Sequence, residues 1–216
     1  MRNVFKIIIA LLVLKRALVF SEQQKRVFFG DTHLHSSYSF DAFLINNHSA
    51  DPDTAYRFAK GQPVIHPFNR TRVQINTPLD FLVVSDHAEL LGVMRAVREG
   101  KFIETDMGPL GNVQRWYSFR LINDAIDNNT GLAFFRRFLP QNPVIKNHTD
   151  PVKDQSNDLS DISVFGDMRP TSRAAWDDIV ESADRHNDPG KFTSFLGWEW
   201  SSIPLGANLH RIVITP

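Results

Sequence analysis

The chain has 216 residues, 24 basic and 24 acidic side chains, a hydrophobic share of 42% and no cysteine. Its length fits one domain, and its 17 phenylalanines and 4 tryptophans can bury a sizeable core, which excludes wholesale disorder. Zero net charge and the lack of a basic run remove the usual signature of a nucleic-acid-binding protein. Without cysteine there is no disulfide, thiolate zinc site or cysteine nucleophile, so histidine and carboxylate groups remain as metal ligands.

Residues 1–21 have the pattern of a targeting segment that is separate from the fold. Arg2 and Lys6 give a positive start, and an apolar run over residues 7–14 precedes polar residues 21–24. The run is shorter than the roughly 20 apolar residues that cross a membrane, but it fits the apolar part of a signal peptide. We therefore expect a signal peptide or leader over residues 1–21, no membrane span, and an exported protein that is periplasmic or secreted.

Strand and helix patterns alternate along the rest of the chain, which predicts an α/β sheet or barrel. A continuous apolar run such as residues 81–84 is typical of a strand covered on both faces, as in parallel sheets. In chain order we expect a strand at 27–35, a short helix that Asp51 caps, an irregular hairpin or loop at 63–77, the strand at 81–84, a helix at 88–99, an amphipathic helix at 113–126, a surface insertion at 142–167, a helix from about 171 to 186, and strands at 192–200 and 209–214.

The first group of possible ligands is the segment Asp31-Thr32-His33-Leu34-His35, at the end of the first expected strand. Alternate side chains of a strand share a face, so Asp31, His33 and His35 should point the same way. Two imidazoles about 7 Å apart along a strand can converge on one metal, and a nearby carboxylate can orient an imidazole. A lone histidine on a strand is usually structural, but two in register beside an aspartate indicate a functional site.

Asp86 and His87 follow the apolar strand at 81–84, where α/β folds place active-site residues. Alternatively, Asp86 caps the next helix and His87 is merely exposed. Taken together with the histidines of the first strand, the functional interpretation is favoured. Asp41, in the loop after the first strand, is either a ligand or a turn or helix-cap residue.

Glu199 and His210 lie in the last two expected strands. Glu199 is a lone carboxylate in an otherwise aromatic and apolar strand, where an unpaired charge would be costly. It therefore needs a partner, and the candidates are a metal ion and an arginine such as Arg211. His210 on its own is weak evidence for a site.

An HxH motif on the first strand, a DH after the second, a later glutamate and then a histidine follow the motif order of the PHP (polymerase and histidinol phosphatase) superfamily. Three segments carry the closest likeness: GDTHLHSSYSFD at 30–41, LDFLVVSDHAE at 79–89 and GWEWSS at 197–202. They resemble an uncharacterised bacterial branch of PHP-like proteins, often exported and assigned to a domain of unknown function. The resemblance covers about residues 26–215.

The resemblance implies an α/β fold of a particular kind, a distorted (β/α)7 TIM-like barrel with metals at its carboxyl rim. The family draws further ligands from strands beyond the equivalent of His210, and a barrel typically takes about 250 residues. We therefore expect residues 26–216 to form the N-terminal part of a PHP-like metal-dependent hydrolase domain. The barrel would be incomplete at its C-terminal end, and the chain would be a fragment of a longer protein.

The resemblance also implies which side chains act. Glu199 would bridge a first metal, held by the two histidines of the first strand, and a second metal bound by His210. Asp41 and His87 would contribute to a third metal. Histidine and carboxylate ligands admit two or three divalent ions and do not choose among Zn, Mn and Fe. The implied metal ligands are thus His33, His35, Asp41, His87, Glu199 and His210.

The same resemblance assigns roles beyond coordination. Glu199 and His87 would be the catalytic residues, and Asp31 and Asp86 would orient the ligands. The expected activity is hydrolysis, most simply of a phosphoester, by metal-activated water. The expected partner is a small-molecule or phosphoester substrate, and no motif indicates which one or the oligomeric state.

Three alternatives compete with this interpretation. Calcineurin-like metallophosphoesterases also begin with a Gly-Asp-x-His strand, but their later Gly-Asp-x-x-Asp and Gly-Asn-His-Glu motifs do not occur here. An amidohydrolase also opens with HxH, and the sequence argues against it only weakly. The third is a non-catalytic or degenerate metal-binding remnant.

Overall fold

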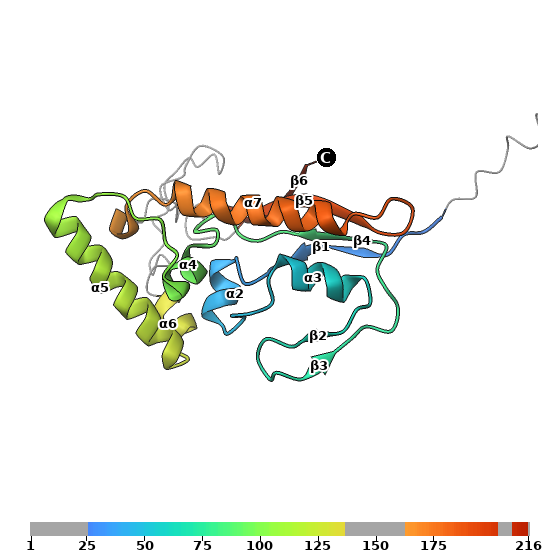
Figure 1. The fold of residues 1–216 in the computed structure, drawn as a ribbon, viewed down its shortest axis with the longest axis horizontal. Helices are drawn as coiled ribbons and strands as arrows, with labels where there is room; N and C mark the ends of the chain where they lie inside the picture. The colour runs from blue at the N-terminus through green and yellow to red at the C-terminus, as the bar shows by residue number, and fades with distance from the viewer. Residues whose placement is uncertain (1–25, 137–162, 203–208, 216) are drawn as a thin grey trace, which may run out of the picture.

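A computed structural model of the chain describes residues 26–136, 163–202 and 209–215 (Figure 1). The expected leader over residues 1–21 and most of the expected insertion at 142–167 lie outside this part of the chain. In chain order the described elements are β1 (Gly30–Leu34), α2 (Phe40–Leu44), α3 (Pro52–Ala59), β2 (Val64–Ile65), β3 (Arg72–Val73), β4 (Phe81–Val84), α4 (Val93–Glu99), α5 (Gly108–Asp127), α6 (Gly131–Arg136), the 3-10 helix η2 (Ser163–Phe165), α7 (Arg169–His186), β5 (Thr193–Ser202) and β6 (Leu209–Thr215).

Within the described residues, four strands form one sheet in the order β1-β4-β5-β6. β1, β4 and β5 run parallel to one another, and β6 runs antiparallel to β5. A separate small sheet pairs β2 with β3 in antiparallel register, where the sequence predicts an irregular hairpin. The fold is therefore mixed α/β, with a curled four-stranded sheet and a small second sheet.

The expectation of an incomplete, distorted (β/α)7 TIM-like barrel is wrong. Such a barrel needs a run of parallel strands, whereas the sheet formed by the described residues holds three parallel strands and one antiparallel strand. Residues 203–208, between β5 and β6, are too few for a crossover connection, which takes a dozen or more residues. β6 therefore returns beside β5 as a hairpin partner.

One face of the sheet is covered by α3 and α7. Leu82 of β4 packs there in a buried cluster with Tyr56 of α3 and Ala183 of α7. As predicted, Asp51 caps α3, and its side chain accepts a hydrogen bond from the backbone N–H of Thr54. These contacts bury Leu82 and Val84 of β4 and hold the carboxyl ends of the parallel strands in place.

A second apolar core joins the short helices α2 and α4 to α5 and α6 (Figure 1). It anchors α2, whose first turn carries Asp41, beside the end of β1. This packing brings the carboxylate of Asp41, which the sequence predicts in a loop, to the sheet edge on a helix. The buried members of this core include Phe40, Phe43, Val93, Met94, Ile122 and Ile126.

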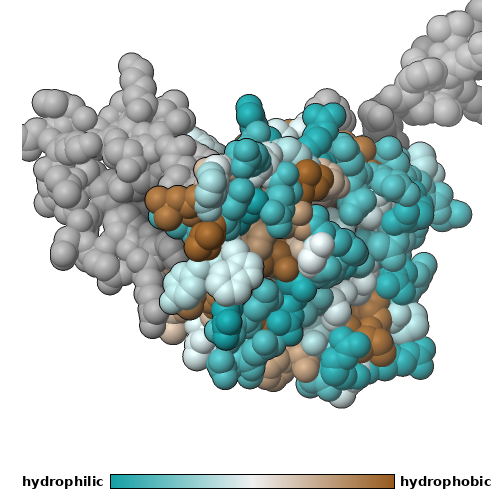
Figure 2. All heavy atoms as spheres, turned by 60° about the vertical axis from the view of Figure 1, so that its left-hand side comes forward, coloured by the Kyte–Doolittle hydropathy of each residue, from teal (hydrophilic) through white to brown (hydrophobic). Residues whose placement is uncertain are grey.

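The sequence predicts a buried apolar face along the helix at 113–126, and the structure buries only the C-terminal half of that face. Its C-terminal part is buried through Ile122 and Ile126, but Val113 and Trp116 in its N-terminal part are each 61% exposed. Figure 2 turns this side of the molecule forward and shows hydrophobic side chains among polar ones at the surface. Helical periodicity predicts which residues share a face, but not how far neighbouring elements extend to cover it. In the described part of the chain, no helix is long and apolar enough to cross a membrane.

Candidate metal centre

Side chains of the metal-ligand types gather at the carboxyl edge of the three parallel strands. His33 and His35 come from the end of β1, His87 follows β4, and Glu199 lies in β5. An isolated parallel bridge between His87 and Glu199 extends the β4–β5 pairing to the site. The structure brings together all six side chains that the sequence singles out as ligands: His33, His35, Asp41, His87, Glu199 and His210.

Among the described residues, these six fall into three overlapping sets. In each set one ligand atom from each residue lies within 4.8 Å of the others. Any two sets share one residue, but only Glu199 offers two ligand atoms with which to bridge a pair of ions, because a neutral imidazole has one free nitrogen. Binding of an ion by any of the sets stays a prediction. The sets are His33, His35 and Glu199; His35, Asp41 and His87; and His87, Glu199 and His210.

Glu199 is fully buried at the centre of the cluster. Its Oε2 lies 2.9 Å from Nε2 of His33 and 2.7 Å from Nε2 of His35, while its Oε1 contacts Nδ1 of His210. The carboxylate thus divides its two oxygens between two groups of imidazoles, as a carboxylate that bridges two ions would. The alternative arginine partner is not used, because the guanidinium of Arg211 lies over a tryptophan ring, 5.1 Å from its centre.

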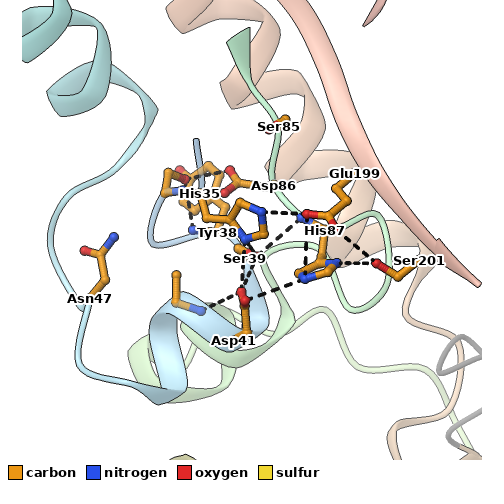
Figure 3. A network of polar contacts seen from close by, with 12 residues as sticks. His35, Tyr38, Ser39, Asp41, Asn47, Ser85, Asp86, His87, Glu199 and Ser201 are labelled. Carbon is orange, nitrogen blue, oxygen red and sulfur yellow. Dashed lines mark hydrogen bonds and ion pairs between the residues drawn. The ribbon is translucent and has the colours of Figure 1, made fainter. Parts of the chain in front are cut away.

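The ring of His35 lies between Glu199 and Asp41 (Figure 3). Its Nε2 faces Glu199, whereas its Nδ1 lies 3.2 Å from Oδ1 of Asp41 and 3.0 Å from Oγ of Ser39. A histidine that binds metal through one nitrogen commonly donates from the other to a carboxylate. Asp41 therefore can orient His35 through Oδ1, and its Oδ2, 3.6 Å from Nε2 of His87, remains free to act as a ligand.

Asp86 and Asp31, which the sequence predicts as orienting groups, act on the main chain. Asp86 is buried and accepts hydrogen bonds from the backbone N–H of Ser36 at 2.5 Å and from its hydroxyl at 2.6 Å. Asp31 accepts one from the backbone N–H of His33 at 2.9 Å. Within the described residues, both carboxylates hold the segment that carries the β1 histidines and neither bonds to an imidazole ring.

The charges of the cluster shift the pKa of its members. Burial opposes ionisation of Asp41, but hydrogen bonds from His35 and Ser39 and the nearby imidazole of His87 outweigh it and hold the pKa of Asp41 well below its ordinary value. Burial lowers the pKa of His87, but the carboxylates of Asp41 and Glu89 have a larger effect in the opposite direction. The net result is a pKa raised from the ordinary value of histidine to about 9. At neutral pH the imidazole of His87 is therefore protonated in the metal-free chain, and metal binding there must release a proton.

A pH-dependent stability is expected from Asp86. Burial raises its pKa to about 6 despite the two bonds from Ser36. A group whose pKa is raised on folding contributes stability that is full below its unfolded pKa, near 4, and is lost as the pH rises to about 6. The variant Asp86→Asn cannot ionise, so its free energy of unfolding relative to wild type should rise between pH 4 and 6. The rise should be on the order of 3 kcal/mol and level off above that range.

Urea unfolding of both proteins at several pH values measures this difference. The exposed Asp124 on α5 offers a matched control, since Asp124→Asn changes the same group outside the core. A difference that is flat across the range, or that falls with pH, would contradict the assigned burial of a charge at Asp86.

Three polar residues of the site are absent from the sequence-based prediction: Ser39, Glu89 and Ser201. The hydroxyl of Ser201 lies 3.1 Å from Nδ1 of His87 and 3.0 Å from Nδ1 of His210. Strand alternation puts Ser201 on the same face as Glu199, so this neighbour could have been found from the pattern. Glu89 stands two residues after His87, but no sequence rule shows that the turn there directs it back to the site.

The sequence matches the family described as "Protein of unknown function (DUF3604)" over residues 22–216, so the chain belongs to that family. No curated protein and no solved structure matches the chain. The family description names no activity, and the chemistry must be argued from the geometry of the site.

Proposed function

We propose that this member of the DUF3604 family is a metal-dependent hydrolase of phosphoesters, related to the PHP superfamily that its motifs resemble. The observation that carries the proposal is the position of Glu199, whose two oxygens face different imidazoles. Pairs of ions that share ligands are a common solution for in-line displacement at phosphorus. The ligand types permit Zn, Mn or Fe.

The chain's own residues would hold and orient the reacting groups. Divalent ions bound here would supply electrophilic activation of water and of the phosphoryl group. Glu199 and His87 form the buried floor of the site. The side chains of His33 and His210 are 51% and 42% exposed, which marks the side from which a substrate would approach. The targeting pattern at residues 1–21 supports the further proposal that the protein works outside the cytoplasm.

Replacement of His33 by alanine should abolish metal-dependent hydrolysis. His33 is half exposed, so its loss should leave the fold intact while removing one ligand of the first set. We expect turnover of bis(4-nitrophenyl) phosphate, measured in Mn²⁺ or Zn²⁺ after metal removal, to fall by at least about 100-fold.

His48→Ala provides the control, since His48 is exposed and packs beside Phe43, away from the three sets. Unchanged metal-dependent turnover in His33→Ala would overturn the assignment of the site. Tight metal binding by the wild-type chain without turnover of any ester would instead favour a non-catalytic metal-binding protein.

A further inference from the structure

Glu89 is a buried carboxylate next to the metal-ligand cluster and belongs to none of its three sets. Its side chain is 5% exposed. Oε1 accepts a hydrogen bond from the backbone N–H of Ser201 at 3.0 Å. Oε2 makes no hydrogen bond within the described part of the chain and lies 3.5 Å from Nδ1 of His87. A carboxylate oxygen buried in this way is costly unless it serves a charged or donating neighbour.

The two nitrogens of His87 face different surroundings. Nε2 lies 3.6 Å from Oδ2 of Asp41 and 3.9 Å from Oε2 of Glu199, so it is the nitrogen turned to the proposed ions. Nδ1 faces Oε2 of Glu89 and the hydroxyl of Ser201. Binding of metal through Nε2 requires a neutral ring with its proton on Nδ1.

We infer that Glu89 is a positioning residue that selects the ring tautomer of His87 in which Nε2 is free to bind metal. The inference rests on the proposed metal centre. A carboxylate can only accept at Nδ1, so it favours the proton there. Through Oε1, Glu89 also fixes the main chain of Ser201, whose hydroxyl lies 3.3 Å from Oε1 of Glu199. Glu89 therefore couples the turn after β4 to the end of β5.

The variants Glu89→Gln and Glu89→Ala distinguish a positioning role of Glu89 from a merely structural role, because the two roles predict a different order of metal affinity for them. In Glu89→Gln the shape is kept, but one arm of the side chain becomes a donor. If its oxygen keeps the bond from Ser201, its NH2 faces Nδ1 of His87 and forces the proton onto Nε2. If the amide adopts the opposite orientation, its NH2 group faces the backbone N–H of Ser201, and two donors then meet without an acceptor. Glu89→Ala presents no donor, and the hydroxyl of Ser201 can still accept from Nδ1.

Titration of the metal-stripped full chain with Zn²⁺, followed by calorimetry, tests the inference. We expect Glu89→Gln to bind Zn²⁺ about 10–100-fold more weakly than wild type, and Glu89→Ala to lose less than Glu89→Gln. Thermal unfolding should show the reverse order, because alanine leaves a cavity and glutamine does not. A structural role predicts the same order in both measurements, with alanine worse, and that result would overturn the inference.

A second measurement decides the matter even if Glu89→Ala does not fold. Nitrogen NMR of the metal-free chain, recorded above the pH at which the imidazole of His87 titrates, reports which ring nitrogen carries the proton. Asp41 and Glu199 favour a proton on Nε2 in the metal-free chain, so the comparison between variants carries the test. We expect the fraction of rings with the proton on Nδ1 to be lower in Glu89→Gln than in wild type, and an equal fraction in both would refute the role of Glu89.

The failure of this inference can be told apart from the failure of the proposed function. Wild-type chain that binds no divalent ion would refute both, because no metal centre would then exist. Wild-type and Glu89→Gln chains that bind Zn²⁺ equally would refute the role of Glu89 alone. Glu181→Gln, an exposed position on α7 whose side chain is 75% accessible, is the matched control and should bind as wild type does.

Discussion

Replacement of Glu199 by glutamine should abolish tight binding of divalent ions at the site. Glu199 is fully buried and serves two of the three ligand sets, so its loss removes the shared anionic ligand from both. The amide that replaces it carries no charge to offset bound cations, and one of its two arms donates rather than accepts. Removal of one member of a buried charge pair typically costs about 3–5 kcal/mol, which corresponds to at least about 100-fold in affinity.

Calorimetric titration with Mn²⁺ and Zn²⁺ measures this effect directly. Substitution of the exposed Glu181 by glutamine removes the same charge elsewhere and should leave affinity and stoichiometry unchanged. His33→Ala should lose the first set only, so its stoichiometry should fall less than that of Glu199→Gln. Full stoichiometry and unchanged affinity in Glu199→Gln would show that this carboxylate bridges nothing.

Substitution of Gly197 by valine should strongly destabilise the protein. Gly197 lies in β5 between β4 and β6, and a Cβ at this position would meet Cγ1 of Val83 at 2.6 Å and the carbonyl oxygen of Val213 at 2.7 Å. Since the carbonyl belongs to the β6 backbone, the strands must move apart to admit a side chain. We expect a loss of about 3 kcal/mol and a melting temperature lower by about 6–12 °C.

Thermal unfolding compares this variant with Thr193→Val, which changes an exposed position of the same strand. The control should unfold close to wild type. Because Gly197 precedes Glu199 by two residues in β5, metal affinity should also fall in Gly197→Val at temperatures where it remains folded. A melting temperature equal to that of wild type would show that β5 does not approach its neighbours this closely.

Four of the six ligand residues could be found from the sequence because they stand in local patterns with chemical meaning, whereas Asp41 and His210 were assigned through the resemblance to PHP proteins. His33 and His35 alternate on a strand, His87 follows an apolar strand, and Glu199 is an isolated charge in an apolar segment. These patterns depend on one strand at a time. The closeness of the six groups, by contrast, depends on the order and register of β1, β4, β5 and β6.

Two features of the fold were not predicted from the sequence, and the reason is the same for both. The antiparallel return of β6 depends on the short link between two strands, whereas the likeness to PHP proteins suggested a barrel. The exposure of Val113 and Trp116 depends on how far neighbouring elements reach along α5. Alternation and helical periodicity describe a segment alone and contain no information about its neighbours.

Local chemistry along the chain was enough to identify the α/β class, the helix that Asp51 caps, the buried strand β4 and four residues of the candidate metal centre, to which the resemblance added Asp41 and His210. Only the tertiary structure decided that one oxygen of Glu199 faces His35 and the other faces His210. The same holds for Glu89, whose side chain turns back to His87. The reason is physical: strand and cap preferences act over a few residues, whereas the direction of a buried carboxylate is set by contacts between segments more than 100 residues apart.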